Sequence, residues 1–269
     1  EPVSMARQVQ LVRTFAQRNL KSRFKGSALG WLWSLLVPLA QLAIYTMVFS
    51  FIFRAVPPDM GHGRPGIFVL FLFCGLTFWT FFSGSITGAM GELMSSGSIL
   101  QKVYFPAYAP VLGSVWAVGT QSLIEVGLLA LVMAILGNVG VSWLLLPLWM
   151  LLTVAFTAAV SVSLAILNVY FRDLSHLVSI VLQLLFYLTP IIYPLSMAEA
   201  VPLFARFTLA DVLYLNPLTS FVQLFRSLIY ELEFGTFQQW AVAAGWTLIA
   251  GIVAFHVNKK RGEDLGENV

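Results

Sequence analysis

The sequence predicts an all-α integral membrane protein from its composition, its long uncharged windows and the positions of its basic residues. Of 269 residues, 59% are hydrophobic and 10% are charged, whereas a soluble domain has about 25% charged residues. We expect a single transmembrane domain of six helices. An amphipathic interface helix precedes them, and short re-entrant helices precede the last span. The spans are predicted near 33–54, 67–90, 107–136, 143–170, 175–194 and 235–257.

The predicted spans follow from stretches without charge. The windows that lack Asp, Glu, Lys and Arg are 26–53, 65–91, 103–124, 126–171, 174–198 and 234–258. Each supplies the roughly 20 apolar residues that a spanning helix needs. The window 126–171 is long enough for parts of two spans, and its GNVG sequence at 137–140 predicts the turn between them.

The basic residues predict the orientation of the spans. Eleven Lys and Arg residues fall on the side of the two termini and four on the opposite side. Since basic residues concentrate in cytoplasmic segments, we expect both termini in the cytoplasm. The net charge of +3 reflects this topology and does not indicate a nucleic-acid partner.

Residues 5–22 are expected to form a helix that lies on the membrane. Apolar side chains share one face of this helix: Met5, Val9, Val12, Ala16 and Leu20. Basic and polar side chains cover the other face, and a segment of this kind lies among lipid headgroups. The alternative is a cytoplasmic helix that packs against its own protein.

The segment 199–233 is predicted to enter the outer leaflet without crossing it. Its hydropathy around 212–230 could indicate a seventh span, but Asn216-Pro217 interrupts this stretch and Arg226 lies within it. The apolar residues follow the spacing of an amphipathic helix, not of a helix that is apolar all round. A seventh span would also move the basic C-terminal cluster to the outside.

The sequence offers no candidates for catalysis. No stretch fits the P-loop pattern G-x-x-x-x-G-K-[ST], so the chain is not expected to bind ATP in that way. Cys74 is the single cysteine, which excludes a disulfide within one chain. The three histidines are isolated, and neither a metal-ligand cluster nor a nucleophile–base pair is visible. We therefore expect no catalytic residues, metal or cofactor in this chain.

Two predicted cytoplasmic segments carry candidate binding residues. Four cations precede the first span, at Arg18, Lys21, Arg23 and Lys25. They either anchor the chain at the interface or contact an anionic, pyrophosphate-bearing lipid headgroup. The loop 92–105 contains a helix-length piece and has about the size of a docking helix for a soluble partner. Arg172 and Asp173 predict a second, tighter cytoplasmic turn.

Within the spans, one acid and a set of aromatic residues are candidates for functional sites. Glu125 is the lone acid in a span, and it is either a pathway residue or an interior structural contact, with Gln121 one turn away. Aromatic rings stack against sugars, so some of them are candidates for contact with a carbohydrate. The candidates are Tyr45, Phe49, Phe82 and Tyr193.

Four motifs in order give the chain a family resemblance. They are RFKGSALGWLWSLLVPL at 23–39, LQKVYFP at 100–106, NVYFRDL with YLTPIIYP between 168 and 194, and NPLTSFVQLFRSLIY at 216–230. Together they resemble the permease subunit of ABC exporters for lipid-linked polysaccharides, the Wzm-like family that exports O-antigen, teichoic acid or capsule. The resemblance covers about residues 18–258.

The resemblance implies a type-2 ABC exporter fold in the bacterial cytoplasmic membrane. The permease would form a homodimer, pair with two separate P-loop ATPase subunits that bind ATP and Mg²⁺, and move a polyprenyl-pyrophosphate-linked polysaccharide among membrane lipids. It also implies that 92–105 contains the coupling helix. The candidate coupling residues there are Glu92, Leu100, Lys102 and Tyr104.

Three alternatives remain open at this stage. The same fold could export a drug or a simple lipid. A secondary transporter or channel would more often show paired intramembrane charges or inverted repeats, and neither is visible. A membrane glycosyltransferase would need an acidic cluster for metal and sugar nucleotide, and the predicted cytoplasmic loops are short and poor in acids.

Overall fold

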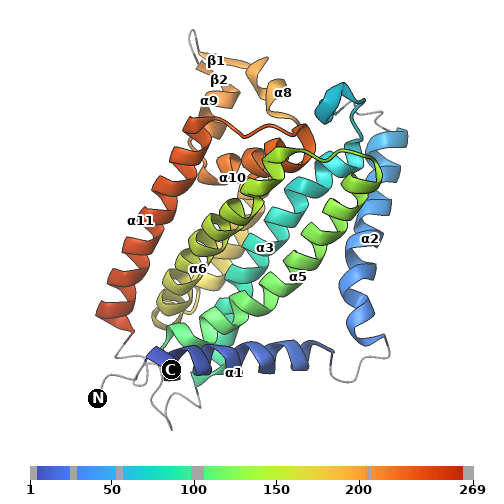
Figure 1. Cartoon of the computed structure of the whole chain (residues 1–269). Coiled ribbons are helices and arrows are strands. Elements are labelled where there is room, and N and C mark those ends of the chain that lie inside the picture. The colour runs from blue at the N-terminus through green and yellow to red at the C-terminus, as the bar shows by residue number, and fades with distance from the viewer. Residues whose placement is uncertain (1–4, 25–28, 53–56, 98–105, 205–206, 263–269) are drawn as a thin grey trace.

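The computed structural model describes residues 5–24, 29–52, 57–97, 106–204 and 207–262. Its long helices run side by side along one axis, while α1, Met5–Phe24, lies across one end of them (Figure 1). Short elements cap the opposite end. The long helices therefore form one layer of membrane-spanning length, with α1 across one face of this layer and short elements at the other.

Four of the described helices are long and apolar enough to cross a membrane. They are α3, Phe68–Ser95; α5, Tyr108–Ile135; α6, Leu146–Tyr170, with the preceding 3₁₀ turn Val141–Leu145; and α11, Phe237–Arg261. α3 packs against α5 and α6, and α11 packs against α6. α3 is the most buried of the four and α11 the least, so α3 is the centre of the subunit.

Two further apolar helices are shorter than the spans expected for them. α2, Trp33–Tyr45, follows the 3₁₀ turn Gly30–Leu32 and continues as a π-helical segment, Thr46–Ile52. α7, Leu174–Leu188, ends six residues before the expected boundary at 194. Pro190 lacks a backbone N–H and disfavours helix at the residue before it, which accounts for this early end.

The end opposite α1 contains the segment that was expected to be re-entrant. It comprises α8, Leu195–Glu199; α9, Leu209–Tyr214; α10, Pro217–Arg226; and a π-helical turn, Ser227–Glu231. Between α8 and α9, strands β1, Pro202–Phe204, and β2, Phe207–Thr208, pair antiparallel. This small ribbon is a departure from the all-α expectation. The 10 residues of α10 span about 15 Å, half of a bilayer core.

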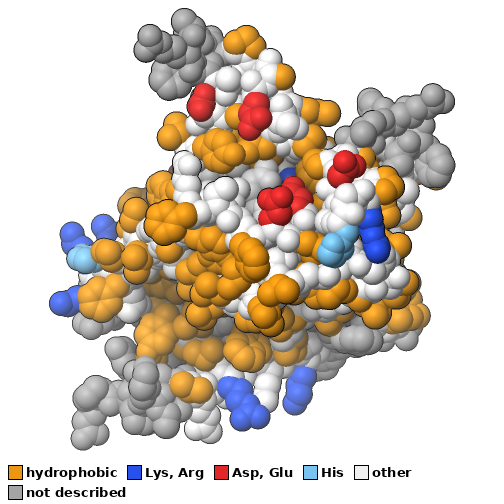
Figure 2. All heavy atoms as spheres, turned by 45° about the horizontal axis from the view of Figure 1, so that its top comes forward, with side chains coloured by type: hydrophobic (Ala, Val, Ile, Leu, Met, Phe, Trp, Pro, Cys, Tyr) orange, Lys and Arg blue, Asp and Glu red, His pale blue; other side chains and the backbone are white. Residues whose placement is uncertain are grey.

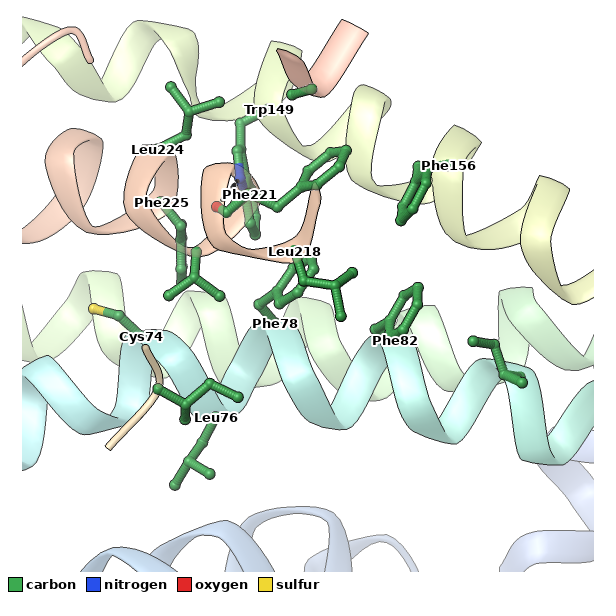
Figure 3. Close-up of a cluster of buried hydrophobic side chains, with 14 of the residues drawn as sticks. Cys74, Leu76, Phe78, Phe82, Trp149, Phe156, Leu218, Phe221, Leu224 and Phe225 are labelled. Atoms are coloured by element: carbon green, nitrogen blue, oxygen red, sulfur yellow. Dashed lines mark hydrogen bonds between the residues drawn. The ribbon is translucent and has the colours of Figure 1, made fainter. Parts of the chain in front are cut away.

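The hydrophobic core lies between α3, α6 and α10. Phe78 of α3 stacks against Phe221 of α10 with ring centroids 5.8 Å apart, and Trp149 of α6 stacks against Phe225 at 4.2 Å. Figure 3 shows these rings interleaved between the three helices. α10 is buried on all sides, although its sequence predicts an amphipathic helix. Its polar residues therefore need partners inside the protein.

Charged side chains are distributed unevenly over the surface. Acidic residues gather at the end formed by α8, α9 and the turn after α10, whereas basic residues gather at the opposite end, on α1 and the end of α11 (Figure 2). Apolar side chains cover most of the area between them. This arrangement matches a surface that is surrounded by lipid at its middle and by water at both ends.

Candidate functional site

The most connected site is a buried cation on α10. Arg226 has 0% exposure. Its Nη2 donates a hydrogen bond to the carbonyl oxygen of Ile191 at 2.6 Å, Nη1 donates to that of Pro190, and Nε donates to that of Phe71 at 3.3 Å. The guanidinium also lies 3.6 Å from the centroid of the Phe71 ring, a cation–π contact. One side chain therefore joins α10 to α3 and to the segment that follows α7.

The end of α7 supplies the acceptors for this cation. Because the helix stops at Leu188, the carbonyl groups of Pro190 and Ile191 have no helical partner and are available to Arg226. Gly75 of α3 permits the close approach, since a Cβ there would lie 3.0 Å from both Arg226 Nη2 and Ile191 Cγ2. A buried charge is costly unless it is bonded, and here three carbonyl oxygens provide the bonds.

The beginning of α10 is attached to the same segment. Asn216 caps the helix, with its side-chain oxygen accepting a hydrogen bond from the Leu218 N–H at 3.0 Å. Its Nδ2 donates to Thr189 Oγ1 at 2.9 Å and to the carbonyl oxygen of Leu188 at 3.2 Å. Both ends of α10 therefore hold the point at which α7 breaks.

Side chains from α6 and from the segment between α5 and α6 donate to the backbone of the same region, residues 217–231, which we call the outer junction after its predicted side of the membrane. Trp149 Nε1 donates to the Phe221 carbonyl oxygen at 2.9 Å, and Ser142 Oγ donates to that of Leu228 at 2.7 Å. Asn138 Nδ2 donates to that of Tyr230 at 2.9 Å. Each of these bonds ties a buried carbonyl group of this region to another part of the chain.

A second site lies at the end of the bundle near α1. Arg18 Nη2 forms an ion pair with Glu92 Oε1 at 2.6 Å. α1 also packs against α5 through Phe15, because Gly113 has no side chain: a Cβ there would lie 2.6 Å from the Cβ of Phe15. The ion pair thus connects α1 to the end of α3, which leads into the predicted coupling loop.

This ion pair joins Arg18, one of the four cations predicted to contact a lipid headgroup, to Glu92, one of the four residues predicted to couple to the ATPase. Lys21 is exposed on α1. The side chain of Arg23 and the whole of Lys25 lie outside the described residues, as do Leu100, Lys102 and Tyr104.

A tight turn joins α6 to α7 at Arg172 and Asp173, as the sequence predicted. Both side chains are exposed, and these two described side chains form no ion pair with each other. Backbone bonds hold the turn, with Leu174 N–H donating to the Phe171 carbonyl oxygen at 3.0 Å. Exposure to water accounts for the absence of pairing, since solvated charges gain little from it.

Glu125 is 7% exposed on α5 and faces α2 and α3. It accepts hydrogen bonds from Thr80 Oγ1 and from Gln121 Nε2, both at 3.2 Å. Gln121 Nε2 also donates to the Ser34 carbonyl oxygen at 2.6 Å. These contacts form a polar group between three helices and leave Glu125 beside a cavity.

The four candidate aromatic residues do not lie together. Tyr45 and Phe49 are adjacent on the α2 side, with ring centroids 6.2 Å apart, and are half-buried. Tyr193 is half-buried near α8, and its hydroxyl donates to the Tyr187 carbonyl oxygen at 2.9 Å. Phe82, however, is 4% exposed and stacks against Phe78 and Phe156. It points into the core of its own subunit (Figure 3), because α6 covers this face of α3.

Arg226 was not among the site residues predicted from the sequence. Its charge counted only against a seventh span. The sequence nevertheless contains a signal for this site: one cation in an apolar segment, together with the two prolines of the LTPIIYP sequence. A membrane-embedded cation needs acceptors, and proline-interrupted helices provide carbonyl groups.

A bundle of apolar helices, with a basic amphipathic helix across one end and a buried half-length helix near the other, defines a polytopic membrane protein. The chain belongs to the ABC-2 type transporter family, which matches residues 10–230. It is the permease of an ABC-2 exporter and thus a transport subunit.

Among its relatives is the O-antigen export system permease protein RfbA of Myxococcus xanthus. That protein is 31% identical over 264 residues, which cover 96% of this chain and 95% of the relative. A protein of the same name from Klebsiella pneumoniae is 31% identical over 220 residues, covering 81% of this chain and 79% of the relative.

Proposed function

We propose that two copies of this chain and two copies of a separate P-loop ATPase form an exporter for a polyprenyl-pyrophosphate-linked polysaccharide. Relatives named as O-antigen export permeases support this substrate class, and one of them aligns with 96% of the chain. The ATPase subunits would bind ATP and Mg²⁺. Export of a drug or a simple lipid on the same fold is the alternative.

We infer that the chain crosses the bacterial cytoplasmic membrane six times with both termini in the cytoplasm. The four long helices account for four crossings, and α2 and α7 for two. The 15 residues of α7 reach about 22 Å, and the turns and bends of residues 189–193 would complete the crossing. α1 would lie in the cytoplasmic headgroup region, and the outer junction would lie in the outer leaflet.

A polar stripe on α7 carries the proposal for a glycan path. Four exposed side chains with hydrogen-bonding groups follow each other at spacings of three and four residues: His176, Ser179, Gln183 and Tyr187. Residues at this spacing share one face of a helix. Hydrocarbon does not solvate such groups, so this face would line a water-filled path between two subunits. Sugar hydroxyl groups would find partners along it.

The remaining candidate residues take supporting roles in this proposal. Tyr45, Phe49 and Tyr193 are kept as candidates for the path wall, while Phe82 is left out because it is buried within one subunit. Residues 92–105 would contact the ATPase. The basic residues from Arg18 to Lys25 would lie near the entering pyrophosphate, and the exposed turn at Arg172 and Asp173 would face the cytoplasm.

Export in cells and ATPase activity in vitro would test the proposal. In a host without its own O-antigen permease, the chain and its ATPase should restore surface polysaccharide, and Gln183→Leu should reduce it at least fivefold. Gln238→Leu, which removes an exposed amide from α11, is the matched control. The purified complex should hydrolyse ATP faster with lipid-linked polysaccharide. Stimulation by hydrophobic drugs but not by this lipid would favour the alternative.

A further inference from the structure

A cavity lined by both polar and apolar groups lies between α2, α3 and α5. Its volume is about 390 Å³. Polar side chains line it from all three helices: Ser34 and Gln41 of α2, Thr80 of α3, and Gln121, Ser122 and Glu125 of α5. The rest of the lining is Trp33, Val37, Pro38, Phe81, Gly84 and Val118. A cavity that contains a carboxyl, two carboxamides and three hydroxyl groups is unusual among apolar helices.

Part of the hydrogen-bonding capacity of this cavity is unused within the described part of the chain. Thr80 and Gln121 each donate a hydrogen bond to Glu125. For the side chains of Gln41 and Ser122, by contrast, the structure records no hydrogen bond to another described residue. Polar groups inside a bilayer are stable only when they are bonded. The cavity is therefore suited to an occupant that both donates and accepts hydrogen bonds.

The mouth of the cavity lies on the surface of α2. Trp33 is 47% exposed and Val37 is 49% exposed, and Gln41 is exposed as well. Trp33 and Gln41 are eight positions apart, which corresponds to about 12 Å along the helix. Since Trp33 begins α2 at the end of the bundle where α1 lies, the cavity runs from that end toward the middle of the bundle.

We propose that this cavity binds a hydroxyl-bearing lipid headgroup that enters from the cytoplasmic leaflet. The hydroxyl groups would donate to Glu125 and to the amide oxygens of Gln41 and Gln121, and would accept from the Gln41 amide and the Ser122 hydroxyl. Trp33 would lie against the headgroup at the mouth, where indole rings are favoured. The inference rests on the proposed orientation, which assigns this end of α2 to the cytoplasmic side.

Two sources carry this chemistry, and binding measurements separate them. One is phosphatidylglycerol, compared with phosphatidic acid, which lacks the glycerol headgroup. The other is a polyprenyl pyrophosphate with one sugar, compared with the same lipid without the sugar. The delipidated complex of permease and ATPase would be titrated with each lipid, and native mass spectrometry would give the dissociation constants. We expect at least fivefold tighter binding of the hydroxyl-bearing member in one pair or both.

Variants then assign the preference to the cavity. Gly84→Leu fills the space without removing a hydrogen bond, since a Cβ at Gly84 meets only Val118 at an ordinary distance of 3.5 Å. It should reduce the preference to less than twofold. Gly91→Leu on the same helix has open space around it and should leave the preference unchanged. If Gly84→Leu does not assemble, Gln41→Leu alters an exposed side chain and is compared with Gln238→Leu.

Equal binding within both lipid pairs would overturn the proposal, because the cavity would then hold water only. A preference that survives Gly84→Leu and Gln41→Leu would also overturn it, since the headgroup would bind elsewhere. The measurement is independent of export. A complex that fails to export polysaccharide but keeps the preference would refute the proposed substrate and leave the headgroup site intact.

Discussion

Arg226 and Ile191 are joined by a hydrogen bond of 2.6 Å between a fully buried guanidinium and a backbone carbonyl oxygen. The bond crosses from α10 to the segment at which α7 ends. Because Asn216 holds the same segment from the other end of α10, the outer end of α7 and the outer junction form one unit. If α7 lines the transport path, movement at its outer end must involve α10.

Removing the Arg226 cation should destabilise the subunit strongly. Arg226→Met leaves the buried carbonyl groups of Pro190 and Ile191 without their donor, at a cost of roughly 2–5 kcal/mol. Arg226→Lys should cost less, because it keeps a cation but not three donors in one plane. Unfolding of the purified chain in micelles would measure both. Arg172→Met, at an exposed position, is the control, and equal stability of the two methionine variants would contradict the prediction.

Gly75 should not tolerate a side chain. A Cβ would lie 3.0 Å from Arg226 Nη2 and 3.1 Å from the Ile191 Cα, so Gly75→Val must displace the broken end of α7. Overpacking of this kind costs about 1–3 kcal/mol. Gly91→Val in the same helix meets no atom within 4 Å and should be nearly neutral. The two variants would be compared by thermal unfolding, and similar midpoints would show that the approach at Gly75 is not tight.

The Arg18–Glu92 ion pair should affect coupling more than stability. The Arg18 side chain is 45% exposed and that of Glu92 13%, and partly solvated pairs contribute about 0.2–1 kcal/mol. Arg18→Glu should lower the amount of polysaccharide exported per ATP hydrolysed, because α1 loses its connection to the end of α3. The exchanged pair Arg18→Glu with Glu92→Arg should restore it. Failure of the exchange, with both single variants impaired, would assign Arg18 to lipid binding instead.

Glu231 should make stability depend on pH. It lies outside the long helices, burial raises its pKa above the ordinary 4.5, and Ser227 donates a hydrogen bond to it at 3.0 Å. A carboxyl with a raised pKa binds more protons in the folded state than in the unfolded state, so stability falls as pH rises above about 4.5. Glu231→Gln should therefore be more stable than the parent at neutral pH, and the difference should shrink toward pH 4. Unfolding of both proteins at pH 4 and at pH 7 would measure this, and an equal difference at the two pH values would contradict the prediction.

The positions of the long helices were predictable from the sequence, because the absence of charge over 20 or more residues has one common explanation in a chain of this composition. The helix at the N-terminus was predictable from a different signal, the 3.6-residue periodicity of its apolar residues. The helix α7 ends six residues before the predicted end of its span. Hydropathy continues through the LTPIIYP sequence, whereas the backbone of Pro190 ends the helix.

The contacts between helices were not predictable in the same way. Phe82 and Tyr45 are both aromatic residues in apolar stretches, and only the packing of α6 on α3 buries the first of them. Arg172 and Asp173 are adjacent in sequence but do not pair, because both reach water. The partners of Arg226 are backbone carbonyl groups, which carry no signal in the side-chain sequence.

The hydrogen bonds of the outer junction also predict which positions should keep the same amino acid across species. Most of these bonds run from a side chain to a main-chain oxygen. The donors are the side chains of Arg226, Asn138, Ser142 and Trp149. Residues such as Ile191, Leu228 and Phe221 contribute only their carbonyl groups. Every amino acid has such a carbonyl group. Across species, the donor positions should therefore keep their identity, while the acceptor positions exchange one apolar residue for another without loss of a bond.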